Sequence, residues 1–180
     1  MNEDLSLELS KVKQVSGFLK GLFLLVLVFT ALVFLFTISL LTGWLPIGNI
    51  TSSHLILGNI EIELESLNLA AKLVAAVFLM IHFGFAARIC WDFSRLFGSF
   101  EKGSIYTSET VKILGNIGRW LILIWIAGVV GPFLVVSQSG SSSASFNFDF
   151  NILFVGVILF LLSWIFEVGR KIQEENALTI

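Results

Sequence analysis

Residues 21–41 read GLFLLVLVFTALVFLFTISLL, an apolar stretch that contains no charged side chain. A helix needs about 20 predominantly apolar residues to cross the hydrocarbon core of a bilayer, so this stretch predicts a transmembrane helix. Three more apolar stretches follow along the chain. We therefore predict an all-α membrane protein, a bundle of four transmembrane helices over residues 18–42, 67–91, 117–136 and 150–168.

The composition of the whole chain supports this class. Hydrophobic residues make up 56% and charged residues 13%, and the mean hydropathy is +0.93. A soluble domain carries about 25% charged residues, which excludes an ordinary globular fold. The stretch at 21–41 also exceeds the roughly 7–15 apolar residues of a secretory signal, so we expect it to be retained. Residues 1–180 then form a single integral membrane domain.

The basic residues predict how this domain is oriented. Of the 11 Lys and Arg residues, only Lys72 lies on one side of the four stretches. Positive charge collects in cytoplasmic loops, so we predict cytoplasmic termini, with loop 92–116 and tail 169–180 on that side and loops 43–66 and 137–149 outside. The other basic residues all fall on the cytoplasmic side: Lys11, Lys13, Lys20, Arg88, Arg95, Lys102, Lys112, Arg119, Arg170 and Lys171.

The first outer loop has the alternating pattern of β structure. Residues 54–57 and 60–65 flank Gly58-Asn59, a pair that suits a tight hairpin turn. In the second run, apolar residues alternate with Glu61, Glu63 and Glu65, so one face is apolar and the other acidic. A similar alternation over 145–150 predicts a third strand. We expect a small extracytoplasmic β element whose apolar face is turned towards the bundle.

The third helix has recognisable local signals. Thr107 resembles an N-cap, and Glu109 is placed favourably in the first turn. Gly115 and Gly118 predict a bend where this helix enters the bilayer, and Pro132 predicts a kink in its outer half.

His82 is the candidate intramembrane polar site. Ala71, Ala75 and Ala86 share its helical face, and faces of small residues mark close helix contacts, so His82 is expected to look into the bundle. An ionisable residue at this depth suggests a proton or ligand path. The favoured interpretation is a neutral histidine hydrogen-bonded to a neighbouring helix. Ser163 is the one nucleophile at membrane depth that could pair with it.

The sequence gives little support for bound cofactors, metals or nucleic acid. Bis-histidine haem ligation needs a second intramembrane histidine, and His54 lies in an outer loop. Cys90 is the only cysteine, which excludes a cysteine-built zinc site. The net charge of −2 argues against direct nucleic-acid binding. We expect no cofactor and no catalytic residue.

Charged residues near the inner interface form candidate ion pairs. Glu167 precedes Arg170 by three residues and Lys171 by four, so they can pair along one helical face. Glu167 could instead reach Arg88 or Arg119 at the same membrane depth. Because an unpaired charge near lipid is costly, a structural clasp is the favoured interpretation of this group.

Two cytoplasmic blocks carry a family resemblance. One is residues 100–107, FEKGSIYT, continuing through Glu109, and the other is residues 167–180. Together they resemble a bacterial family of small four-span inner-membrane proteins known only as a domain of unknown function. Members of that family are often encoded beside a small helix-turn-helix regulator, which implies a cytosolic partner of that kind. The candidate partner-binding residues are Phe100, Lys102, Gly103, Tyr106, Glu109, Gln173, Glu174, Glu175 and Asn176.

Three function classes remain open. We favour a non-enzymatic regulator that binds a cytosolic, transcription-factor-like partner through its inner loop and C-terminal tail. In that case the loop and tail would pack together on anchors at Phe97, Phe100, Tyr106, Ile172 and Leu178, although both blocks could also serve only to cap the bundle. The alternative is a small homo-oligomeric transporter or channel with His82 near the path. An intramembrane enzyme ranks last.

Overall fold

The computed structural model describes residues 2–41, 54–57, 60–63, 68–103, 107–139 and 150–177. Within these residues the chain forms four helices and one hairpin of two strands. The elements are α1 (Asn2–Leu41), β1 (His54–Leu57), β2 (Ile60–Glu63), α2 (Leu69–Glu101), α3 (Ser108–Ser139) and α4 (Asn151–Ala177).

All four helices are long and apolar enough to cross a membrane, which makes this a multi-pass membrane protein. The helices are also longer than a membrane requires. At about 1.5 Å per residue, the 40 residues of α1 extend roughly 60 Å, twice the approximately 30 Å hydrocarbon core. The apolar segments that qualify are Ser10–Ser39, Leu69–Glu101, Ser108–Gln138 and Asn151–Asn176.

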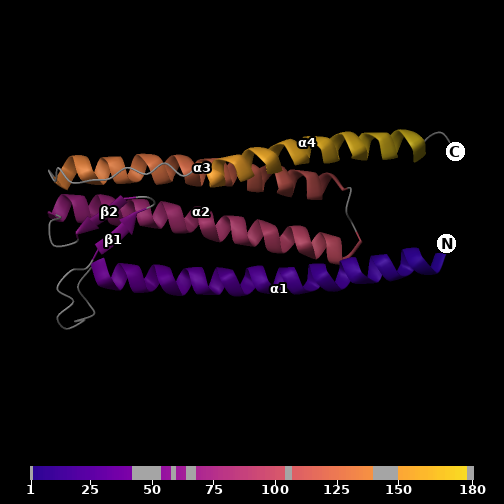
Figure 1. Ribbon diagram of the computed structural model, residues 1–180, viewed down its shortest axis with the longest axis horizontal. Coiled ribbons are helices and arrows are strands. Elements are labelled where there is room, and N and C mark those ends of the chain that lie inside the picture. The colour runs from indigo at the N-terminus through magenta and orange to yellow at the C-terminus, as the bar shows by residue number, and fades with distance from the viewer. Residues whose placement is uncertain are drawn as a thin grey trace.

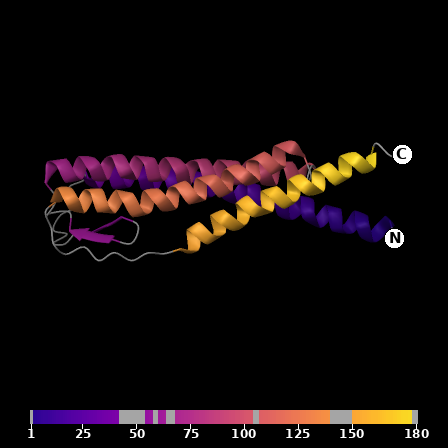
Figure 2. The ribbon, with the colours of Figure 1, turned by 90° about the horizontal axis from the view of Figure 1, so that it is seen from above.

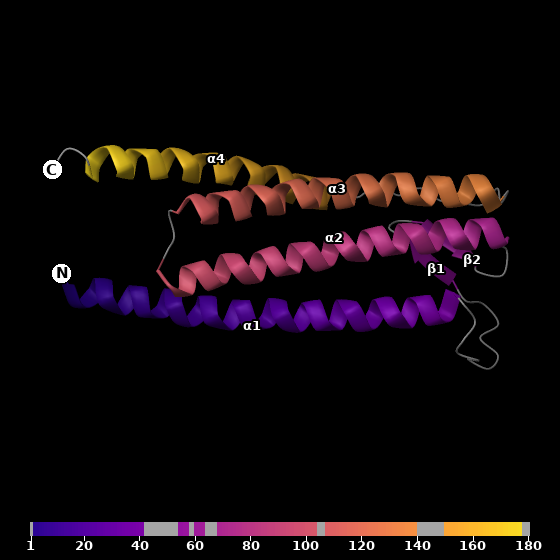
Figure 3. The ribbon, with the colours of Figure 1, turned by 180° about the vertical axis from the view of Figure 1, so that it is seen from behind.

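The helices pack in chain order, each against the next: α1 on α2, α2 on α3 and α3 on α4 (Figures 1 and 3). Both termini and the connection between α2 and α3 lie at one end of the molecule, and the hairpin lies at the other (Figure 1). We call the first the basic end and define it by residues 2–20, 92–112 and 167–177. Figure 2 shows α4 crossing α3 obliquely, so its last turns diverge from the other helices.

The hydrophobic core lies between α2 and α3. None of the most apolar segment of α1 is buried inside the protein, whereas 22% of the corresponding segments of α2 and α3 is. Ala71 and Ala75 are fully buried, in agreement with the small-residue face predicted for the second helix. The buried cluster consists of Ile89, Leu96, Ile113, Leu114, Ile117 and Ile124.

Glycines bring α3 and α4 into close contact. A Cβ atom on Gly118 would lie 2.8 Å from the backbone oxygen of Gly156 and 2.8 Å from the backbone nitrogen of Phe160. One on Gly115 would lie 3.1 Å from Ser163 Oγ. Gly115 and Gly118, where a bend was predicted, lie within one continuous helix, α3, and they let the neighbouring helix α4 approach closely. The helix also continues through Pro132.

Aromatic rings join α1 to α2. Phe23 stacks on Phe93 with ring centroids 4.7 Å apart and on Phe97 at 5.6 Å. Further along the same pair of helices, Phe34 lies 5.2 Å from Phe83. These contacts join the two helices through side chains.

The strands of the hairpin pair antiparallel, with His54 opposite Glu63 and Leu57 opposite Ile60, and β1 contacts α3. The turn predicted at residues 58–59 and the end of the second run at 64–65 lie outside the described residues. So does the third strand predicted over 145–150, except for its last residue, Phe150, which directly precedes α4. Nearby, Asn68 caps α2 by accepting from Ala71 N at 2.8 Å and donates to Gln138 O at 2.8 Å. That amide fastens the start of α2 to the end of α3.

Candidate functional site

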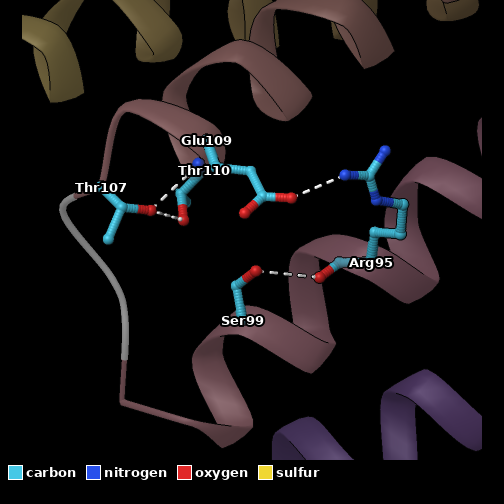
Figure 4. Close-up of polar contacts among 5 residues, drawn as sticks. All are labelled: Arg95, Ser99, Thr107, Glu109 and Thr110. Carbon is cyan, nitrogen blue, oxygen red and sulfur yellow. Dashed lines mark hydrogen bonds and ion pairs between the residues drawn. The ribbon is translucent and has the colours of Figure 1, made fainter.

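The connection between α2 and α3 is shaped by a helix cap (Figure 4). Thr107 Oγ1 accepts from Thr110 N at 3.2 Å and lies 2.9 Å from Thr110 Oγ1. This geometry confirms the N-cap predicted for Thr107. On the other side of the connection, α2 ends at Glu101 and Gly103 takes a φ of 78°, a left-handed conformation that glycine adopts easily.

An ion pair joins the two helices beside this cap. Arg95 Nη2 lies 2.6 Å from Glu109 Oε1 (Figure 4). Both side chains are partly exposed, so the pair contributes about 0–1 kcal/mol and mainly sets how the helices meet. The acidic residue placed in the first turn of α3 therefore also contacts α2.

A second ion pair joins α1 to α2. Lys20 Nζ lies 3.1 Å from Glu101 Oε2. Phe100 packs against the buried core cluster, and its ring meets Phe97 edge-on at 6.1 Å. Phe97 and Phe100, which were predicted to anchor the packing of the loop against the tail, both pack against neighbouring helical side chains. Two other predicted anchors, Tyr106 and Leu178, lie outside the described residues.

On α4, an arginine is held between two carboxylates. Arg170 Nη2 lies 2.6 Å from Glu167 Oε1 and Arg170 Nε lies 3.0 Å from Glu167 Oε2, while Nη1 contacts Glu174. Of the partners considered for Glu167, the helical neighbour Arg170 is the one it meets. Arg88 instead lies 3.3 Å from Asp92, and Arg119 is exposed.

The candidate partner-binding residues form two separate groups. In the first, Lys102, Gly103 and Glu109 are exposed and Phe100 is half-buried. In the second, residues 173–176 are exposed on the last turns of α4. Among the described residues, the exposed positions of the loop and those of the tail lie in separate segments, because α4 packs on α3 and then extends past the connection (Figures 1 and 2).

His82 lines a hollow of about 360 Å³ between α1, α2 and α3. The hollow is bounded by Thr30 on α1 and by Gly128, Gly131 and Pro132 on α3. Ser163 belongs to a different seam, where it is buried against Gly115 and donates to Phe160 O at 2.7 Å. The structure thus does not bring Ser163 and His82 together.

Asp92 is a buried acid that the sequence patterns did not predict. Asp92 is 1% exposed, and its Oδ2 has no hydrogen-bond partner among the residues that the structure describes. The 3.3 Å approach of Arg88 Nε is an ion-pair contact without hydrogen-bond geometry. Helical spacing could have predicted its burial. Asp92 follows Ile89 by three residues and precedes Leu96 by four, which places it on the core-facing side of α2.

Comparison with known proteins defines the family. No curated protein and no solved structure matches the chain. One family model does, over residues 8–180, which includes all of the basic end beyond the first turns of α1. The chain therefore belongs to the family described as protein of unknown function (DUF2975).

Proposed function

We propose that this protein is a non-enzymatic regulator of the bacterial inner membrane whose basic end faces the cytoplasm. The positions of the basic residues support this orientation. They gather at the end of the molecule where both termini and the α2–α3 connection lie, and positive charge favours the cytoplasmic side of a membrane. The hairpin is then extracytoplasmic. A reporter that is active only in the cytoplasm should be silent when fused after Gln138 and active after Ala177.

The observation that carries the regulatory function is the projecting end of α4. This helix continues to Ala177, past the α2–α3 connection. Ion pairs of Arg170 with Glu167 and Glu174 stabilise this part of the helix. The apolar side chains of Val168 and Ile172 are exposed one turn apart among polar residues. Such a face suits a protein partner, and the proposed partner is a cytosolic helix-turn-helix regulator.

Site-specific photo-crosslinking tests this assignment. A photoreactive residue at Ile172 should crosslink a discrete cytosolic protein in cells, and mass spectrometry should identify it as a helix-turn-helix regulator. The matched control is Ile158, which is exposed to a similar degree on the apolar part of α4 and should crosslink lipid instead. Deletion of 173–180 should abolish the adduct while insertion into the membrane persists. An adduct that survives the deletion, or none at Ile172, would refute the proposal.

The hollow beside His82 supports a second candidate function, transport by a small oligomer. A polar side chain lines a space of about 360 Å³ within an apolar segment, where ionisable groups commonly mark ion paths. In proteoliposomes, His82→Ala should then change the pH dependence of an ion flux. Gly128→Leu should block that flux, because nothing lies within 4 Å of a Cβ at Gly128 and the new side chain can fill the hollow. A flux that neither change affects would remove this candidate.

A further inference from the structure

Two hollows lie along the same side of the α1–α2 seam. The first, which we call the polar hollow, measures about 540 Å³ at the basic end and is lined by Lys20, Trp91, Ser94, Arg95, Lys102 and Glu109. The second, the apolar hollow, measures about 520 Å³ and is lined by Leu27, Val28, Ala31, Met80, Gly84 and Ala87. One hollow is charged, and the other has no ionisable side chain.

The two hollows follow one another on consecutive turns. On α2, residues 80, 84, 87, 91, 95, 98 and 102 are separated by three or four positions, the spacing that keeps side chains on one helical face. On α1, residues 20, 24, 27 and 31 repeat the same spacing. Because α1 and α2 are neighbours, these stripes form one track that begins with cations and continues into apolar surface.

The track has the dimensions of a lipid in one leaflet. Its apolar part runs from Leu24 to Phe34 on α1, about 15 Å at 1.5 Å per residue and half of the roughly 30 Å hydrocarbon core. Trp91, whose side chain is exposed, stands where the charged part meets the apolar part. Tryptophan is enriched at the level of the headgroups, so this junction matches the membrane interface.

The charges at the polar end favour an anionic headgroup. Three cations line the polar hollow, and the acids near them are Glu109, paired with Arg95, and Glu101, paired with Lys20. The balance is positive by one charge, and Lys102 makes no ion pair within the described part of the chain. Arginine has five N–H donors, so Arg95 can contact Glu109 and still donate to a phosphate.

We propose that this track is a binding site for one anionic phospholipid. The phosphate and its headgroup lie among Lys20, Arg95 and Lys102, and an acyl chain lies in the apolar hollow against Ala31, Gly84 and Ala87. Basic pockets between transmembrane helices bind anionic lipid headgroups for the same electrostatic reason. The site is independent of the partner surface on α4, because the two lie on different helices.

Lipid titration of the purified full-length protein tests the headgroup half of the proposal. In native mass spectrometry, phosphatidylglycerol should bind more tightly than phosphatidylcholine with the same acyl chains. The double change Lys20→Gln and Lys102→Gln should weaken phosphatidylglycerol binding on the order of tenfold, because each cation near the surface contributes several-fold in affinity. The matched control, Lys112→Gln with Lys171→Gln, removes two exposed lysines of the basic end outside the track and should retain binding.

Substitutions at two glycines test whether an acyl chain binds in the apolar hollow. Nothing lies within 4 Å of a Cβ at Gly84, so Gly84→Leu fills the apolar hollow without a clash and should reduce lipid binding. Gly128→Leu makes the same change in open space but in the hollow beside His82, and it should leave binding intact. Circular dichroism checks that the helices are retained.

Three results would overturn the proposal. The first is equal affinity for the two lipids, and the second is equal loss in the two lysine double variants. The third is displacement of the lipid by millimolar inorganic phosphate with Gly84→Leu binding normally, which would assign the polar hollow to a free anion instead.

Discussion

The seam between α3 and α4 and the seam between α1 and α2 join helices in opposite ways. At Gly118 and Gly156 the backbones of α3 and α4 approach so closely that an added Cβ would meet main-chain atoms. Along α1 and α2, stacked phenylalanines hold the helices together and leave hollows between them. Lipid tails are as apolar as the side chains, so moving an apolar side chain from lipid into a helix contact gains little free energy. Close packing is then the main source of helix association in the membrane. The glycine seam should therefore be rigid and the aromatic seam open to ligands.

Breaking the glycine seam should have the largest effect. Gly118→Ala places a methyl group 2.8 Å from backbone atoms of Gly156 and Phe160, which cannot rotate away. We expect a loss of about 1–3 kcal/mol in the free energy of unfolding, the usual cost of overpacking. Denaturation by sodium dodecyl sulfate, followed by circular dichroism, measures it.

Gly84→Ala is the matched control for that experiment. It also adds a methyl group to a helical glycine, but no atom lies within 4 Å of the new Cβ. Its unfolding free energy should stay equal to that of the wild type or rise slightly, since alanine is the better helix former. Equal losses in both variants would show that the contact at Gly118 does not matter.

Truncating the aromatic seam should have an intermediate effect. Phe23→Ala removes the stacking on Phe93 and Phe97, which contributes about 0.5–1.5 kcal/mol beyond burial. The same denaturation assay should show a smaller loss than Gly118→Ala. Phe29→Ala, at an exposed position on α1, is the control and should change little. A larger loss of unfolding free energy for Phe23→Ala than for Gly118→Ala would show that the aromatic seam contributes more to stability than the glycine seam.

The smallest effect is expected from the ion pair at the α2–α3 connection. A double-mutant cycle of Arg95→Gln and Glu109→Gln should give a coupling energy of about 0.2–1 kcal/mol, because both side chains are partly exposed. The coupling should shrink in high salt, which screens exposed charges. A coupling that is large and insensitive to salt would mean that the pair is buried in the membrane-embedded protein.

The features predicted correctly are those encoded locally. Thr107 caps α3 because its hydroxyl reaches an amide three residues away, and Glu167 meets Arg170 because helical spacing brings them together. The contacts between helices were not predicted. The sequence does not show that Gly118 faces α4, or that Phe97 and Phe100 pack between helices, because it does not show which neighbour each residue faces.

By itself, the sequence determined the membrane class, the number of long apolar helices and the separation of charge. These follow from composition and from periods of three to four residues, which act within a single helix. Only the tertiary structure decided that Asp92 is buried, that Arg95 meets Glu109, and that cations and an apolar groove form one track between α1 and α2. Each of these depends on how neighbouring helices rotate and shift against one another, and that is set by the sum of many weak packing contacts.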